Sequence, residues 1–180
     1  MHSLDTNPNR IARWDILKGL PGEGPIPRYF HAGHPTPWAE GFVVRFWDEE
    51  GTDWVGNFQG GWWGVASIYD LPESTALIVI AYGACYLLLT ADPGQYVCHR
   101  HGVTSALVDE EGNQLVLAYQ GGALAAYGPD VKQAWIRESI AVDGIKLKSC
   151  VHGIITADIE YNYEGSWRSA HIRALDGSDL

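Results

Sequence analysis

The sequence predicts an all-β protein, built as a meander of consecutive antiparallel hairpins. Three observations support this fold class. Glycine and proline are frequent, with 21 and 9 residues among 180, and they divide the chain into short segments. The 8 Trp and 9 Tyr residues favour strands over helices. The segment IITADIEYNY, residues 154–163, alternates apolar and polar residues with the period of two that a half-buried strand requires.

The first 40 residues differ from the rest of the chain. The segment NPNRIARWDILKGL predicts a short helix, because Asn7 can cap it and Ile11, Trp14 and Leu17 fall on one helical face. The segment LPGEGPIPRYFHAGHPTPW follows, and its prolines exclude a helix or an interior strand. We therefore expect an extended arm that lies on the domain, with Trp38 anchoring it in the core.

Residues 41–180 are expected to form the all-β domain, so that arm and domain make a single unit. GFVVRFW should pair with TDWVGNF across the first DEEG turn, and SALV with NQLVLAY across the second. Glycine ends both turns, where a positive φ is needed. SWRSAHIRAL should pair with IITADIEYNY across a turn at Glu164–Gly165. The segment PDVKQAWIRESI fits a strand or a helix, and its alternation favours the strand.

An internal repeat of 37 residues is suggested by an ungapped alignment of residues 76–95 with residues 113–132. It sets Val79 on Val116 and Tyr82 on Tyr119, and a looser third copy covers 145–177. Repeats of about 40 residues built from short strands are typical of propeller blades. The first hairpin lies too close to the next unit to be a full four-stranded blade. A propeller-like meander, a two-sheet sandwich and a chance similarity of two hairpins all stay open.

Composition and charge restrict the function. The net charge of −10 and the pI near 5.0 disfavour binding to nucleic acid and to anionic membranes. They suit a basic protein partner, or simply solubility. The first residues lack the pattern of a secretory signal, and the longest apolar run is too short for a membrane span. Three cysteines without metal-type spacing indicate reduced thiols in a cytoplasmic protein.

Histidine and cysteine residues supply one possible metal site. An H-x-x-H pair and the segment CHRH provide the potential ligands His31, His34, Cys98, His99 and His101. The H-x-x-H pair lies in a proline-rich loop rather than on a helix, and CHRH has no second cluster at finger-like spacing. These five residues therefore stand as an alternative only. The sequence predicts no cofactor, and it contains no recognisable catalytic motif.

Three segments carry a resemblance to known proteins: GHPTPWAEGFVVRF, WVGNFQGGW and WIRESIAVDGIKLK. They resemble segments of small, uncharacterised bacterial all-β proteins, some of which are similar to the immunity partners of polymorphic toxins. The likeness covers the region from His34 to Leu147. It implies an all-β fold and, through the immunity proteins, a toxin as partner. It transfers no catalytic residues.

We therefore predict a non-enzymatic protein-binding module, and the resemblance implies an immunity protein that sequesters a basic toxin. The alternative is a ligand- or sugar-binding propeller-like protein, or a metal-dependent enzyme that uses the His/Cys or Trp clusters. The residues expected to bind a partner are the carboxylates around the two DEEG turns and the indoles of GGWWG, namely Asp48, Glu49, Glu50, Asp53, Asp109, Glu110, Glu111, Trp62 and Trp63.

Overall fold

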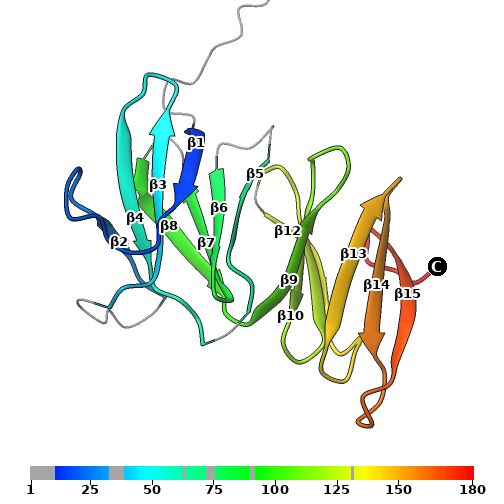
Figure 1. Ribbon diagram of the computed structural model, residues 1–180. Helices are drawn as coiled ribbons and strands as arrows, with labels where there is room; N and C mark the ends of the chain where they lie inside the picture. The colour runs from blue at the N-terminus through cyan, green and yellow to red at the C-terminus, as the bar shows by residue number, and fades with distance from the viewer. Residues whose placement is uncertain (1–10, 33–38, 63, 72–75, 90–91, 131) are drawn as a thin grey trace, which may run out of the picture.

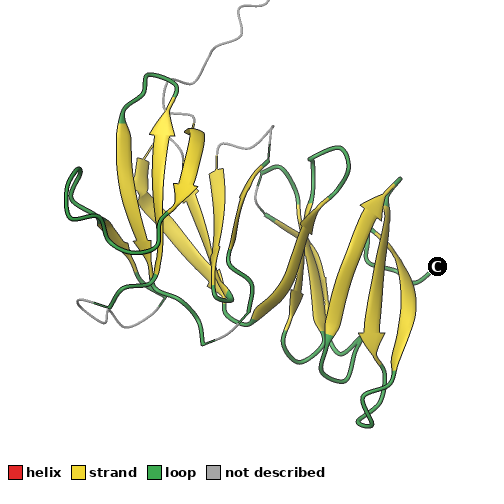
Figure 2. Ribbon diagram, in the orientation of Figure 1, coloured by secondary structure: helices red, strands yellow, loops and turns green. Residues whose placement is uncertain are grey.

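The computed structural model describes residues 11–32, 39–62, 64–71, 76–89, 92–130 and 132–180. The described residues form fifteen strands joined by loops and turns (Figure 2). None of them is helical, and so none belongs to a helix that could cross a bilayer. The all-β fold class is therefore confirmed.

The strands form four sheets that follow one another along the chain. Sheet 1 has the order β1 (Ile11–Ile16), β3 (Phe42–Asp48), β4 (Asp53–Phe58), β2 (Arg28–Phe30). Sheet 2 contains β5 (Ser67–Asp70), β6 (Ala76–Ala81), β7 (Ala84–Leu89) and β8 (Asp92–Arg100) in chain order. Sheet 3 contains β9 (Val103–Val108), β10 (Leu115–Tyr119), β11 (Ala123–Tyr127) and β12 (Gln133–Arg137). Sheet 4 contains β13 (Ile145–Val151), β14 (Ile154–Glu160) and β15 (Trp167–Arg173). The two-sheet sandwich is therefore wrong.

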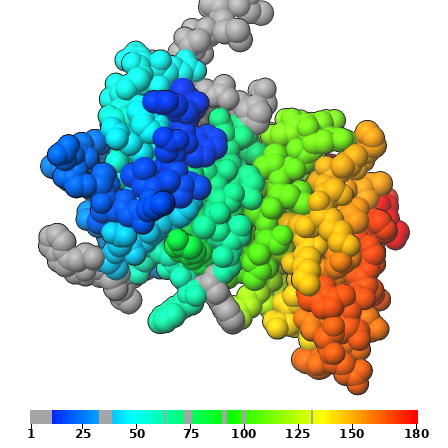
Figure 3. Space-filling model, viewed as in Figure 1, coloured from blue at the N-terminus to red at the C-terminus, as the bar shows by residue number. Residues whose placement is uncertain are grey.

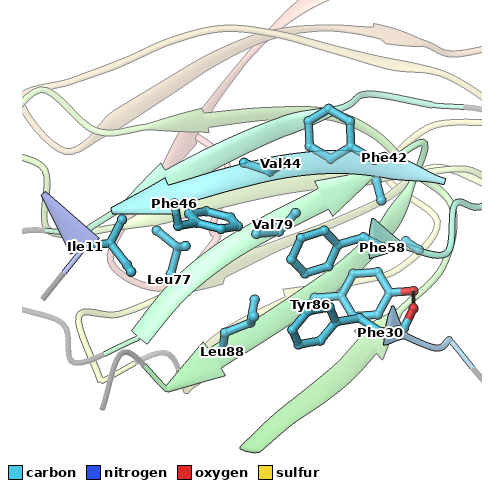
Figure 4. Close-up of a cluster of buried hydrophobic side chains, with 12 residues drawn as sticks. Ile11, Phe30, Phe42, Val44, Phe46, Phe58, Leu77, Val79, Tyr86 and Leu88 are labelled. Atoms are coloured by element: carbon cyan, nitrogen blue, oxygen red, sulfur yellow. Dashed lines mark hydrogen bonds between the residues drawn. The ribbon is translucent and has the colours of Figure 1, made fainter. Parts of the chain in front are cut away.

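The sheets follow one another in a row along the molecule (Figures 1 and 3). They pack face to face, and three hydrophobic cores lie in series between them. The first core lies between sheets 1 and 2, the second between sheets 2 and 3, and the third between sheets 3 and 4. Figure 4 shows the first core, where side chains of the two sheets point toward one another. There the rings of Phe30 and Phe58 stack at 4.4 Å between centroids, and Tyr86 packs edge-on against Phe58.

The N-terminal helix predicted from residues 7–20 is wrong, because Ile11–Ile16 is the strand β1. It pairs antiparallel with β3, and the Leu17 N–H continues the ladder to the Val43 carbonyl at 2.9 Å. The apolar spacing that fits a helical face also lets Ile11 and Trp14 reach the first core. Pairing with an open sheet edge satisfies the backbone of this segment, and such tertiary context overrides a weak helix propensity. The proposed cap Asn7 lies outside the described residues.

The proline-rich arm is described over residues 20–32, and this part joins sheet 1. Its residues Arg28–Phe30 form β2, a parallel edge strand on β4, and Phe30 is only 2% exposed in the first core. Strands β1 and β2 thus complete the first hairpin to a four-stranded sheet, contrary to the expectation of a lone hairpin. Further along the arm, the Asn57 side chain accepts the Gly41 N–H at 2.8 Å and donates to the Ala39 carbonyl. Trp38 lies outside the described residues.

The predicted hairpins are present. Strand β3 pairs with β4, β9 with β10, and β14 with β15, and the ambiguous segment contains the strand β12. On β14 the side chains of Ile155, Ala157 and Ile159 are buried and those between them are half-buried, as alternation requires. The alternation ends with the strand at Glu160, and Tyr163 beyond it is 95% exposed.

The residue equivalences of the repeat are wrong by one position. Val79 faces the first core and therefore the preceding sheet, whereas Val116 faces the third core and therefore the following sheet. Tyr82 lies in the β6–β7 turn and is 47% exposed, whereas Tyr119 ends β10 and is 3% exposed. A shift of one residue in a strand moves every side chain to the other face. Leu117, one residue after Val116, faces the preceding sheet as Val79 does.

Candidate functional site

Both DEEG turns lie at the same end of the row of sheets. The Gly61 N–H donates to the Ala81 carbonyl, and the Val103 N–H to the Gly83 carbonyl, each at 3.0 Å. These bonds place the chain after β4 and the start of β9 beside the β6–β7 turn. The two DEEG turns join the opposite ends of these strands, at the upper edge of Figure 1. We call this end of the molecule, with residues 48–53 and 109–112, the acidic end.

The first aspartate of each turn has a structural role. The Asp48 carboxylate accepts the Thr52 N–H at 2.8 Å. The Asp109 carboxylate accepts the N–H groups of Asn113 and Gln114 at 2.7 and 3.0 Å. In both turns the glycine N–H bonds back to the aspartate carbonyl, and the glycine has a positive φ. Aspartate is favoured here because its short side chain bonds the backbone of its own turn. These two carboxylates therefore accept hydrogen bonds within their own turns.

Two more of the predicted acids are also held in the protein. Asp53 forms an ion pair with Arg45, whose Nε lies 2.5 Å from a carboxylate oxygen. Glu110 accepts the backbone N–H of His152 at 2.6 Å and lies 3.0 Å from the Nδ1 of the same residue. Glu110 thereby joins the first turn of sheet 3 to the β13–β14 turn of sheet 4.

Three glutamates remain that project from the acidic end into solvent. Glu49, Glu50 and Glu111 are exposed, and Glu111 is contacted through its carboxylate by the Asn113 amide at 3.3 Å. Their position in the middle of tight turns directs their side chains outward. They are the part of the predicted acidic set whose charge is presented to a partner.

Trp62 of the GGWWG segment lies at the other end of the molecule. Trp62 follows β4 beyond Phe58, beside the β6–β7 turn, and its side chain is fully exposed. The glycines are needed for close approach, since a Cβ on Gly61 would lie 2.4 Å from the Tyr82 carbonyl oxygen. Trp63 lies outside the described residues. Trp62 is therefore a surface residue, and it does not form one patch with the acidic candidates.

The alternative metal residues are only partly described. The His31 N–H donates to the Tyr96 hydroxyl at 3.1 Å, and Cys98 packs against the first core. Burial raises the pKa of the Cys98 thiol to about 11, so it is protonated at neutral pH. His101 is exposed. His34 and the His99 side chain lie outside the described residues, and among the side chains that are described no three His, Cys, Asp or Glu residues gather as metal ligands would.

An apolar groove at the acidic end was missed by the sequence analysis. Its volume is about 440 Å³, and it is lined by Ala76, Leu87, Leu89, Gln95, Tyr96, Val97 and Asp130. Leu89 is 43% exposed and Val97 is 58% exposed. We call it the β7–β8 groove. The run of three leucines at residues 87–89 was an available signal, because a strand that is apolar at consecutive positions needs cover on both faces.

Two other cavities are lined by residues of sheets 3 and 4 and of the turns beside them. One, of about 430 Å³, lies between β12, β15 and the C-terminal segment, where Arg137 pairs with Asp179. The other, of about 320 Å³, includes Trp167, whose ring is covered on one side by the Lys146 ammonium at 3.9 Å from its centroid. The first cavity is also lined by Ser139, Ser169 and His171, whose Nδ1 lies 3.5 Å from the Thr156 hydroxyl. Among the described residues, no hydrogen bond joins either serine to this histidine.

Comparison with known proteins assigns no family to the chain: no protein-family model matches it, and a search of curated proteins finds no match.

Proposed function

We propose that this protein is a non-enzymatic binding module that captures a basic protein partner with its acidic end. The observation that carries the proposal is the difference between the acids of the DEEG turns. Asp48 and Asp109 hold the turns together, while Glu49, Glu50 and Glu111 project their charge outward. The net charge of −10 adds a long-range attraction for a basic surface.

The immunity-protein form of this proposal rests on the sequence resemblance described above. In that form the partner is a basic toxin domain, and the protein binds it in the cytoplasm, where the three thiols stay reduced. Acidic groups on exposed turns speed the encounter with such a partner and fix its orientation. Capture of this kind needs no catalytic residues.

We also propose a propeller-like relation between the sheets. Sheets 2 and 3 each run through four consecutive strands in chain order, and each packs on the next through its own core. Strands β9 and β13, the first of sheets 3 and 4, lie close together. This arrangement supports a propeller-like relation, in which the first strands of neighbouring sheets lie close together. The turns at one end of the sheets then form a common surface.

The test of the binding function uses the whole chain as bait. The chain is immobilised, its partner is isolated from the cells that encode it, and association rates are measured at low and high salt. We expect the combined variant E49K/E50K/E111K to associate at least about tenfold more slowly at low salt, with the difference shrinking at high salt. The melting temperature should stay unchanged because these side chains are exposed.

The matched control is E164K. Glu164 occupies the same place in the turn Asn162–Gly165 that Glu50 and Glu111 occupy in theirs, since the Asn162 side chain accepts the Ser166 N–H at 2.9 Å. It lies, however, at the opposite end of the molecule. Equal association rates for the wild type and the triple variant at both salts would exclude the acidic end as the binding surface, and an acidic partner would exclude the proposal as a whole.

A further inference from the structure

The β7–β8 groove lies between the two acidic turns, because sheet 2 stands between sheets 1 and 3. Six of its seven lining residues come from sheet 2, and the seventh, Asp130, comes from the turn between β11 and β12. The second core covers Leu87 in part, but sheet 3 leaves Leu89 and Val97 more than two-fifths exposed. Two neighbouring apolar side chains of sheet 2 thus stay open to solvent in the groove.

Carboxylates stand at the rim of the groove. Asp92 pairs with Leu89 in the β7–β8 ladder, and its carboxylate is held by the Gly94 N–H and the Gln95 amide. Asp130 lines the groove directly, and hydrogen bonds from the Lys132 backbone and side chain lower its pKa, so it carries its charge at neutral pH. The Lys132 ammonium, whose side chain is 83% exposed, lies 3.2 Å from it, and surface ion pairs of this kind contribute little to stability.

We propose that the β7–β8 groove binds an extended segment of the partner protein in which apolar side chains alternate with lysine or arginine. The apolar side chains cover Leu89 and Val97, and the basic ones reach Asp92 and Asp130. The open walls suit a peptide segment better than a small molecule, which needs a site that encloses most of its surface. A central apolar anchor within a charged rim is the arrangement that concentrates binding energy at protein interfaces.

The inference rests on the proposed capture of a basic protein, and it names the part of that protein that is recognised. The probe is the synthetic peptide acetyl-Lys-Val-Arg-Leu-Lys-Val-Arg-amide, titrated into the ¹⁵N-labelled full chain and followed by amide chemical shifts. We expect the shifts to concentrate on the amides of residues 87–89, 95–97 and 130. In the variant L89S/V97S the dissociation constant should rise by about tenfold or more. The control V151S/I154S removes apolar side chains of similar exposure, 41% and 39%, on sheet 4 and should bind as the wild type does.

Two further peptides decide whether both features of the groove are used. One replaces the basic residues by glutamate, and the other replaces the apolar residues by serine. Both should bind at least about tenfold more weakly than the probe. Equal binding of either peptide, equal binding by L89S/V97S, or no shift at these amides at roughly 1 mM probe would overturn the inference.

Failure of this inference is distinguishable from failure of the proposed function. If the partner's association depends on Glu49, Glu50 and Glu111 but is unchanged by L89S/V97S, the acidic end captures the partner without the groove. If the probe binds in the groove but the natural partner associates equally fast with the charge-reversed variant, the inference about the groove is supported and the electrostatic capture is excluded.

Discussion

The carboxylate of Glu110 accepts a hydrogen bond of 2.6 Å from the backbone N–H of His152, and so a turn of sheet 3 holds a turn of sheet 4. His152 has a positive φ of 49°, which a residue other than glycine adopts only at some cost. The contact helps to keep this turn in place, and the Glu110 N–H adds a second link to the Cys150 carbonyl at 3.1 Å.

Replacing Glu110 by alanine should therefore destabilise the protein by about 0.5–1 kcal/mol, because a charged acceptor of a backbone N–H is lost from a partly exposed site. Urea denaturation measures the effect. Glu111→Ala is the matched control, since its side chain is exposed in the same turn, and its effect should stay within about 0.5 kcal/mol. A loss as small for Glu110 as for Glu111 would show that the link contributes nothing to stability.

Asp109 should contribute more to the free energy of unfolding than any other acidic residue of its turn. Its carboxylate accepts two backbone N–H groups, and we expect Asp109→Ala to lower the free energy of unfolding by about 1–2 kcal/mol. Asp109→Asn keeps an acceptor oxygen and should recover part of the loss. The same pair of variants at Asp48, which accepts one N–H, should show a smaller effect. Equal losses for alanine and asparagine would contradict the hydrogen-bonding role.

Cys85 should be inert in the native protein. It is 2% exposed in the second core, and burial raises its pKa from the ordinary value of 9.0 to about 12. The reactive species is the thiolate, which is scarce here at neutral pH. A disulfide reagent at pH 8 should label Cys85 only as fast as the protein unfolds, which mass spectrometry of peptides can follow. Labelling of Cys85 faster than global unfolding would show that the second core opens locally.

The same pKa shift predicts how stability depends on pH. Above pH 9 the unfolded chain releases the Cys85 proton while the folded protein retains it until about pH 12. The unfolded state then binds fewer protons, and so stability falls as pH rises through this range, by at most about 1.4 kcal/mol per pH unit for one group. Urea denaturation from pH 7 to 10 should show a steeper loss for the wild type than for Cys85→Ala. Parallel curves would contradict the shift.

Arg137 should hold the C-terminal segment against sheet 3. Its guanidinium donates to the Gly177 carbonyl at 2.6 Å and to both Asp179 oxygens at 2.7 and 3.2 Å. Lysine cannot reproduce this fork. Hydrogen exchange of the Leu180 amide, which bonds the His171 carbonyl, should accelerate in Arg137→Lys. Arg168→Lys alters a cation in the same cavity without that fork, and exchange should be unchanged there.

Much of the fold could be predicted because its strands carry local signals. The hairpins follow from alternating residues and from turns ending in glycine, as at Gly51 and Gly112, which both have a positive φ. The strand β1 could not be told from a helix, since Ile11 and Trp14 fit either period and only the open edge of β3 decides. The alignment of the repeat is wrong by one residue because it matches the identical residues Tyr82 and Tyr119, which differ in burial. In a strand, burial depends on which face of the sheet a side chain occupies.

The candidate site was predictable only in part. Acidic turns can be read from sequence, but which carboxylate is occupied depends on contacts such as Glu110 with His152, 42 residues away. The ends of the molecule at which Trp62 and the DEEG turns lie depend on the direction of each strand in its sheet. The β7–β8 groove depends on how far sheet 3 extends over Leu89 and Val97, which no local pattern encodes.

The pairing of chain neighbours within sheets 2, 3 and 4 has a kinetic consequence. Short loops cost little entropy to close, so these sheets can nucleate independently and early. Sheet 1 is different, because β2 must find β4 in parallel register across the intervening β3 hairpin before Phe30 can enter the first core. The docking of β2 should therefore be the late step of folding. In the native state β2 should also be the first segment to detach, which would expose the edge of β4 while the other three sheets stay intact.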